Sequence, residues 1–177
     1  MKNSIFKRAP HNPPHWFLPN TFYMLTACTY QRERLMWSAR RKSEWLEAFL
    51  KSAQIYKWTV IAWVILHDHY HAIVKSPEKA ENLSKFVASY HKFTARKWND
   101  EDNANGRKVW WNYWDTCLLS ENDYYTRLRY VFWNPVKHGL IDRTEAYEFS
   151  NYQQFLTNWQ AEFDFADMHE VNDDLEP

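Results

Sequence analysis

The order of extended and helical segments constrains the fold of this chain more than any other feature. Runs rich in β-branched and aromatic residues predict strands, and apolar residues at helical spacing predict helices. Together these patterns predict a strand, a helix, two strands, a helix, a strand and a helix, over residues 21–30, 39–56, 58–67, 69–76, 80–98, 109–120 and 121–134. Ser120 with Asp123 predicts a capped start for the last of these helices, and Pro135 predicts its end.

This order is the ferredoxin-like split βαβ pattern, so we expect an α+β fold with an antiparallel sheet of four to five strands. The helices should lie mainly on one face of the sheet, and a C-terminal helical extension should include a helix over roughly 151–161. We expect an irregular N-terminal arm at residues 1–20, one domain at 21–140, and an acidic extension at 141–177 that packs on or near the domain.

The charge is divided unevenly along a chain whose formal net charge is zero. Residues 1–140 hold 21 Lys and Arg against 12 Asp and Glu, a net charge of +9, whereas residues 141–177 hold 1 against 10, a net charge of −9. A basic body suits a polyanionic partner. The acidic end is either a solvated appendage or a segment that lies over a basic groove when no ligand is bound.

Aromatic residues make up 19% of the chain, with 11 Trp, which is more than a core of this size needs. Some rings should therefore be exposed, for stacking on nucleobases or for a protein interface. Cys28 and Cys117 have no metal-type spacing and are expected to be reduced core residues. With no export signal and no long apolar run, the sequence predicts a cytoplasmic protein that does not enter a membrane.

The segment His67-Asp68-His69-Tyr70-His71 carries the strongest chemical signal. Side chains two apart on a strand point to the same face, so His69 and His71 should present two imidazoles side by side as metal ligands. A turn near Asp68 would rotate His67 away. Alternatively, all three histidines form a zinc site, or they are ordinary surface or core histidines.

A second group of polar side chains shares one face of the helix at 121–134. Asp123, Arg127, Tyr130 and Asn134 fall within a stripe about 60° wide. Tyr130 is a candidate nucleophile, and the carbonyl of Asn134 suits a hard divalent cation. Arg127 could stabilise the charge of the reacting phosphate, although a solvated Arg127 and a capping Asp123 are the better interpretations, and Tyr124 and Tyr125 are rival tyrosines.

These residues resemble a known family. His69-Tyr70-His71 resembles the motif of HUH endonucleases, and the stretch from Tyr130 through Asn134-Pro135 to Gly139 resembles the tyrosine-helix signature of REP-associated tyrosine transposases. The resemblance runs from about His15 to Phe155. It marks residues 21–140 as an HUH transposase domain.

The resemblance implies a monomeric prokaryotic enzyme, associated with the nucleoid, that nicks and rejoins single-stranded hairpin DNA beside guide nucleotides. Tyr130 would be the nucleophile of a 5′-phosphotyrosine intermediate, with His69, His71 and Asn134 holding Mg²⁺ or Mn²⁺. The family usually has proline where this chain has His67, so His67 is a possible extra ligand. Two other functions stay open: a catalytically silent hairpin-binding regulator, and a zinc-dependent hydrolase using the three histidines.

The basic and aromatic residues around these motifs are candidates for contact with DNA. They are Arg32, Arg34, Lys92, Arg96, Lys97, Arg107, Lys108, Arg127 and Lys137, with Trp110 or Trp111 to stack on an unpaired base.

Overall fold

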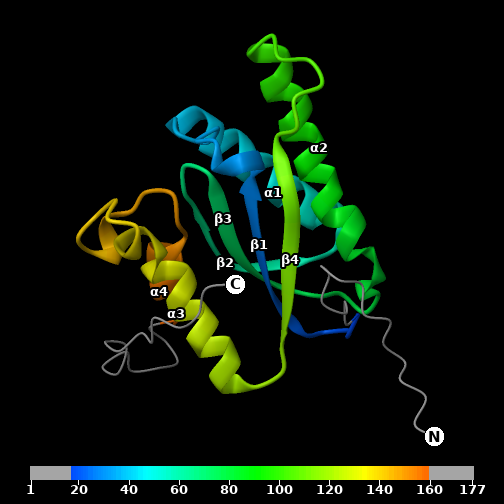
Figure 1. Ribbon diagram of the computed structural model, residues 1–177. Helices are drawn as coiled ribbons and strands as arrows, with labels where there is room; N and C mark the ends of the chain where they lie inside the picture. The colour runs from blue at the N-terminus through cyan, green and yellow to red at the C-terminus, as the bar shows by residue number, and fades with distance from the viewer. Residues whose placement is uncertain (1–16, 160–177) are drawn as a thin grey trace, which may run out of the picture.

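A computed structural model describes residues 17–159, and its element order is the predicted one (Figure 1). The strands are β1 (Phe22–Thr29), β2 (Thr59–Ile65), β3 (His69–Lys75) and β4 (Trp110–Leu118). The helices are α1 (Ala39–Tyr56), α2 (Leu83–Glu101), α3 (Glu121–Lys137) and α4 (Tyr152–Trp159). Short 3₁₀ turns lie at Tyr30–Arg32 (η1), Ala80–Asn82 (η2) and Thr144–Ala146 (η3).

The four strands form one sheet in the order β2-β3-β1-β4, and every neighbouring pair is antiparallel. Each central strand leads through a helix to an edge strand: β1 leads through α1 to β2, and β3 leads through α2 to β4, as in the ferredoxin-like pattern. The register pairs Cys28 with His69 and Thr26 with His71. The end of β1 therefore lies directly beside the histidine motif.

Helices cover both faces of the sheet, because strand residues of both alternations are apolar and buried. The expectation of helices mainly on one face holds for the two longest, α1 and α2, and α3 and α4 cover the opposite face (Figure 1). The first core is largely aromatic and includes Tyr23, Trp45, Phe49, Tyr70, Phe86, Tyr90 and Trp98. The second joins the sheet to α3 and α4 through Met24, Val64, Ile73, Leu128, Val131, Phe132 and Phe155.

The helix α3 continues past Pro135, which was expected to end it, and stops at Lys137. Pro135 lacks the N–H that would bond the carbonyl of Val131 one turn earlier, and the helix extends only two residues beyond it. Gly139 then closes the helix with a positive φ of 64° and donates its N–H to Val136, while Leu140 donates to the carbonyl of Pro135. This is the Schellman pattern of helix termination.

The segment after α3 returns to the sheet edge. Ser150 forms an isolated antiparallel bridge with Val64, and the Asn151 side chain bonds the backbone of Ile61 and Trp63 in β2. Ser150 and Asn151 therefore hold this segment against the edge strand β2. The structure does not describe residues 160–177, nor residues 1–16 of the expected arm. Among residues 17–159, none of the helices has the length and apolar character of a membrane span.

Candidate active site

The alternation of β3 sends His69 and His71 to one face of the sheet, where they are 4% and 3% exposed. Tyr70, between them, points to the opposite face. Its hydroxyl lies 2.7 Å from that of Tyr90 and 3.0 Å from Nε2 of His91. This buried polar contact fixes the side-chain alternation of β3, because a slip of one residue would exchange the two faces.

Each histidine of the pair is oriented by a polar neighbour. The Asp68 carboxylate accepts a hydrogen bond from Nδ1 of His69 at 2.6 Å, and Nδ1 of His71 lies 2.8 Å from Oγ1 of Thr26. Burial alone would raise the pKa of Asp68, but the hydrogen bond and charge of His69, with the charge of Arg32, hold it below its usual value. A carboxylate on Nδ1 leaves the lone pair on Nε2 of His69, as a metal ligand requires.

The pKa of His71 is lowered well below its ordinary value, first by burial and then by the charges of neighbouring groups such as His69 and His138. His71 is therefore neutral at physiological pH. This imidazole is thus in the form that binds a cation without first losing a proton.

Asn134, fully buried on α3, places Oδ1 3.3 Å from Nε2 of His69, while its Nδ2 has no hydrogen-bond partner. With the proton of His69 held on Nδ1, two lone-pair atoms face each other. That arrangement is a poor hydrogen bond but a suitable donor set for one shared divalent cation. The chemistry of His69, His71 and Asn134 therefore fits a metal ion.

Tyr130 lies one helical turn before Asn134, and its ring centroid is 5.0 Å from that of His71. The side chain is 6% exposed, and Nζ of Lys137 lies 5.5 Å from the ring centroid. A pocket of about 150 Å³ opens at this point between the sheet and α3. It is lined by Thr26, Cys28, Arg32, His69, His71, Trp114, Tyr130 and His138.

Five residues of this site were not expected there from the sequence: Thr26, Cys28, Asp68, Trp114 and His138. His138 had a local signal, because it follows Tyr130 and Asn134 at helical spacing, and its ring centroid lies 4.9 Å from that of His69. Thr26 and Trp114 enter through the strand register, which pairs them with each other. No local pattern reveals that pairing.

His67 does not line the pocket. It lies between β2 and β3, where its Nδ1 contacts the guanidinium of Arg34. Burial, followed by the charges of Lys42 and Arg34, lowers its pKa. Within residues 17–159, no group of three His, Cys, Asp or Glu side chains is arranged to hold a metal.

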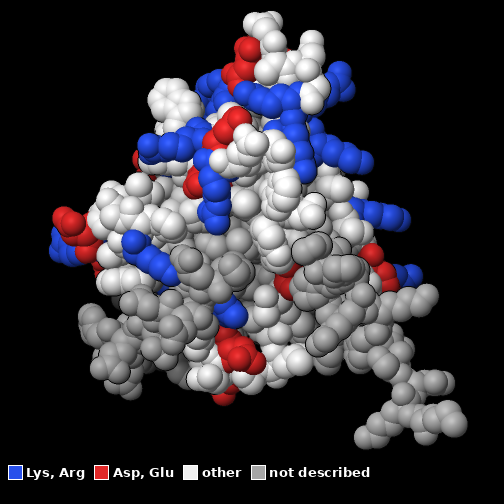
Figure 2. Space-filling view, in the orientation of Figure 1, with Lys and Arg blue, Asp and Glu red and all other residues white. Residues whose placement is uncertain are grey.

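Lys and Arg side chains gather over the half of one molecular face where β1 ends and β4 begins (Figure 2). Arg32 of η1 lines the pocket, and its guanidinium lies 3.9 Å from the Asp68 carboxylate. Lys108 and Trp111 lie at the start of β4. Trp110 is 7% exposed and stacks on His91, so it is a core residue and not an open stacking surface.

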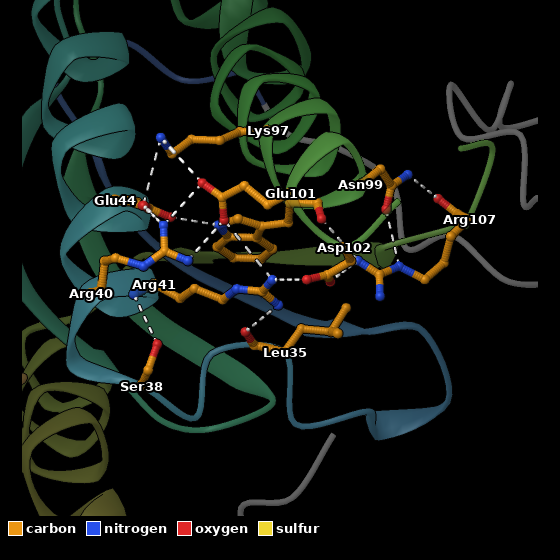
Figure 3. Close-up of polar contacts among 11 residues, drawn as sticks. Leu35, Ser38, Arg40, Arg41, Glu44, Lys97, Asn99, Glu101, Asp102 and Arg107 are labelled. Carbon is orange, nitrogen blue, oxygen red and sulfur yellow. Dashed lines mark hydrogen bonds and ion pairs between the residues drawn. The ribbon is translucent and has the colours of Figure 1, made fainter. Parts of the chain in front are cut away.

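Three of the expected DNA contacts have carboxylate partners on α1 or near the C-terminal end of α2. Lys97 lies 3.6 Å from Glu44 and 3.4 Å from Glu101, Arg107 bonds Asp102 at 2.7 Å, and Arg96 lies 3.9 Å from Asp100. Figure 3 shows that Lys97 and Arg107 belong to a network joining α1 to α2. Arg107 also bonds Asn99, and so anchors the loop that leads into β4.

The remaining expected contacts are spread over the surface. Lys92 is exposed on α2, Arg34 is exposed beside His67, and Arg127 and Lys137 are half-buried on α3.

The fold and the pocket define a ferredoxin-like domain with a histidine pair on its sheet and a tyrosine helix packed against it. Residues 18–124 match the family model described as "Transposase IS200 like". The chain therefore belongs to the IS200-like transposase family, a class of enzymes that act on DNA.

Two relatives and one solved structure show how far the similarity extends. The chain is 27% identical over 122 residues to the REP-associated tyrosine transposase of Escherichia coli K12, covering 67% of this chain and 69% of the relative. A Haemophilus influenzae relative is 25% identical over 121 residues, 63% of this chain and 69% of its own length. The fold matches a REP-associated tyrosine transposase solved with a REP hairpin, with a TM-score of 0.68 at 19% identity over 82% of this chain and 85% of that one.

Proposed function

We propose that this transposase nicks and rejoins single-stranded DNA through Tyr130, by way of a 5′-phosphotyrosine intermediate. The observation that carries the proposal is the convergence of Tyr130 from α3 with His69 and His71 from β3 in one pocket. A hairpin-forming strand is the proposed partner, as the matching solved fold is that of a transposase with a bound REP hairpin.

His69, His71 and Asn134 would hold the divalent cation, which we propose is Mg²⁺ or Mn²⁺ because a carbonyl oxygen such as that of Asn134 suits both ions. When bound, such a cation polarises the scissile phosphate and stabilises the charge of the reacting oxygens. Asp68 and Thr26 keep the two imidazoles in place.

The covalent step exchanges one phosphoester for another. The Tyr130 oxygen forms a bond to phosphorus, the bond from phosphorus to the 3′ oxygen breaks, and the tyrosine proton leaves while the 3′ oxygen gains one. The burial of Tyr130 limits the access of water as a competing nucleophile, and Lys137 places a cation near the tyrosine ring. Because the ester conserves the bond energy, a free 3′-hydroxyl can reverse the step without ATP.

Incubation of a labelled hairpin strand with protein and Mn²⁺, followed by a denaturing gel, tests this proposal. A covalent adduct should form, and Tyr130→Phe should abolish it. Tyr124→Phe and Tyr125→Phe are the matched controls on the same helix and should retain the adduct. Cleavage that persists in Tyr130→Phe would rule out the tyrosine mechanism and favour a hydrolase, whereas binding without any adduct would favour a regulator.

We also propose that the enzyme works as a monomer, because one chain supplies the tyrosine, the two histidines and the amide to the same pocket. Mixing Tyr130→Phe with His71→Ala separates the alternatives. Two inactive variants should stay inactive together if each site is built from one chain. Restored adduct formation would mean that the tyrosine acts on the pocket of a second copy.

A further inference from the structure

A partly exposed aromatic pair lies where β1 ends and β4 begins, with Tyr30 half-buried and Trp111 exposed. The rings of Tyr30 and Trp111 are stacked, with centroids 5.2 Å apart and an interplanar angle of 29°. Trp111 remains 42% exposed. Nζ of Lys108 lies 4.0 Å from the centroid of Trp111 and 4.8 Å from that of Tyr30, so a cation accompanies the pair.

Two chain segments connect this pair to the pocket. Arg32, two residues after Tyr30 in η1, lines the pocket, and so does Trp114, three residues after Trp111 in β4. Three residues of strand span about 10 Å, a length that a few nucleotides of single strand can cover. Arg32 and Trp114 therefore connect the aromatic pair, through η1 and β4, to the pocket that Tyr130 lines.

The backbone of η1 adopts an unfavourable conformation at two residues. Gln31 and Arg32 both have positive φ, 54° and 57°, which residues with a side chain rarely adopt. The turn is fixed by the Thr29 hydroxyl, which bonds the carbonyls of Glu33 and Asp68, and by the N–H of Tyr30, which bonds the carbonyl of Val109. Such strain persists where the surroundings determine the conformation, and it concentrates at functional sites.

We propose that Tyr30 and Trp111 form a stacking site for one unpaired nucleobase of the strand that reaches Tyr130, with Lys108 and Arg32 contacting its phosphates. The inference rests on the proposed function and adds a position that binds a base outside the reacting phosphate. Indole and phenol rings stack on any base, and a lysine amine that leaves the ring face for a phosphate opens that face to the base. The cations beside the rings favour a nucleic acid over an apolar protein partner.

A cycle that combines protein variants with abasic DNA tests the site. A hairpin strand is prepared with a single abasic position, moved one nucleotide at a time through the unpaired region, and its affinity is measured for wild type and Trp111→Ala. Trp111→Ala should weaken binding of intact DNA by about 5- to 150-fold, and Trp111→Phe much less. When the abasic position is the one that stacks on Trp111, the wild type should lose as much affinity as Trp111→Ala loses on intact DNA. Trp111→Ala should bind this abasic strand no more weakly than it binds intact DNA.

Trp37→Ala is the matched control, because Trp37 is 67% exposed on the loop before α1 and lies outside η1 and β4. It should leave the affinity unchanged. Equal affinities of Trp111→Ala and wild type, or losses that multiply at every abasic position, would overturn the stacking site. If wild type still forms the Tyr130 adduct in that case, only this inference fails; if wild type neither binds nor cleaves the strand, the proposed function fails.

Discussion

At the scale of single residues, the protonation states in the pocket are set by neighbours that the motif itself does not name. His69 and His71 become metal ligands only when each has a lone pair on the atom that faces Asn134 or the pocket. Asp68 ensures this for His69, and burial ensures it for His71. The proposed ligand pair therefore depends on a carboxylate next to it in sequence and on a threonine across the sheet.

Asp68→Asn should weaken metal binding while leaving the fold intact, because a neutral amide no longer holds the proton of His69 on Nδ1. Loss of such a supporting hydrogen bond typically costs about 10- to 100-fold in metal affinity or activity. The measurement is the Mn²⁺ concentration that gives half-maximal adduct. Asp100→Asn, an exposed carboxylate on α2, serves as control. An unchanged Mn²⁺ midpoint would contradict the role given to Asp68.

The partly buried His91 should make the stability of the fold depend on pH. Burial lowers its pKa from 6.5 to about 3. Its stabilising effect is complete above pH 6.5 and is lost as the pH falls toward 3, because the unfolded chain gains a proton that the folded chain resists. His91→Gln should remove up to about 1.4 kcal/mol per pH unit from this slope. Urea unfolding at pH 7 and pH 5 gives the change of the free energy of unfolding with pH for each protein. An equal change in wild type and His91→Gln would contradict the role given to His91.

At the scale of elements, α3 carries the proposed nucleophile and the proposed amide ligand, and the pocket histidine His138 follows directly after it, so the helix end determines their alignment. Gly139 ends the helix with φ of 64°, and nothing lies within 4 Å of where a Cβ would be. A substitution there is therefore penalised by the backbone alone and not by a clash.

Gly139→Ala should lower the free energy of unfolding by about 1 to 2 kcal/mol, the usual cost of a left-handed residue with a side chain. Gly139→Asn should cost less, since asparagine tolerates this conformation. Urea denaturation of the three proteins gives the order of stability. If alanine proves as stable as glycine, the helix end adopts another conformation in solution.

Elements formed by local patterns could be predicted from the sequence, and contacts made by the sheet could not. The helix over 39–56 was predicted with the bounds that α1 has, because its apolar spacing is local. The pairing of His69, His71, Tyr130 and Asn134 followed from two periodicities and a family resemblance. Trp110 was expected as a base-stacking surface, but its burial depends on α2 packing against β4, which no local pattern encodes.

At the scale of the whole molecule, the opposed charges of the two parts of the chain raise the question of what the acidic end does. Its described part is structural: Phe155 is buried against Phe132, and the hydroxyl of Tyr147 bonds the backbone of Ile65. Residues 160–177 carry seven Asp and Glu and no Lys or Arg. Structural and electrostatic contributions can therefore be separated by where the chain is cut.

A chain that ends at Trp159 should keep its stability and bind single-stranded DNA more tightly, because seven negative charges no longer oppose a polyanion. The gain should be several-fold at low salt and should fade as the ionic strength rises toward 1 M, where charges are screened within about 3 Å. A chain that ends at Leu140 loses Tyr147 and Phe155 and should unfold at a lower urea concentration than the chain that ends at Trp159. Titrations of both chains across a salt series measure the effect, and an affinity gain that persists in 1 M salt would mean that the acidic end acts by direct obstruction and not by charge.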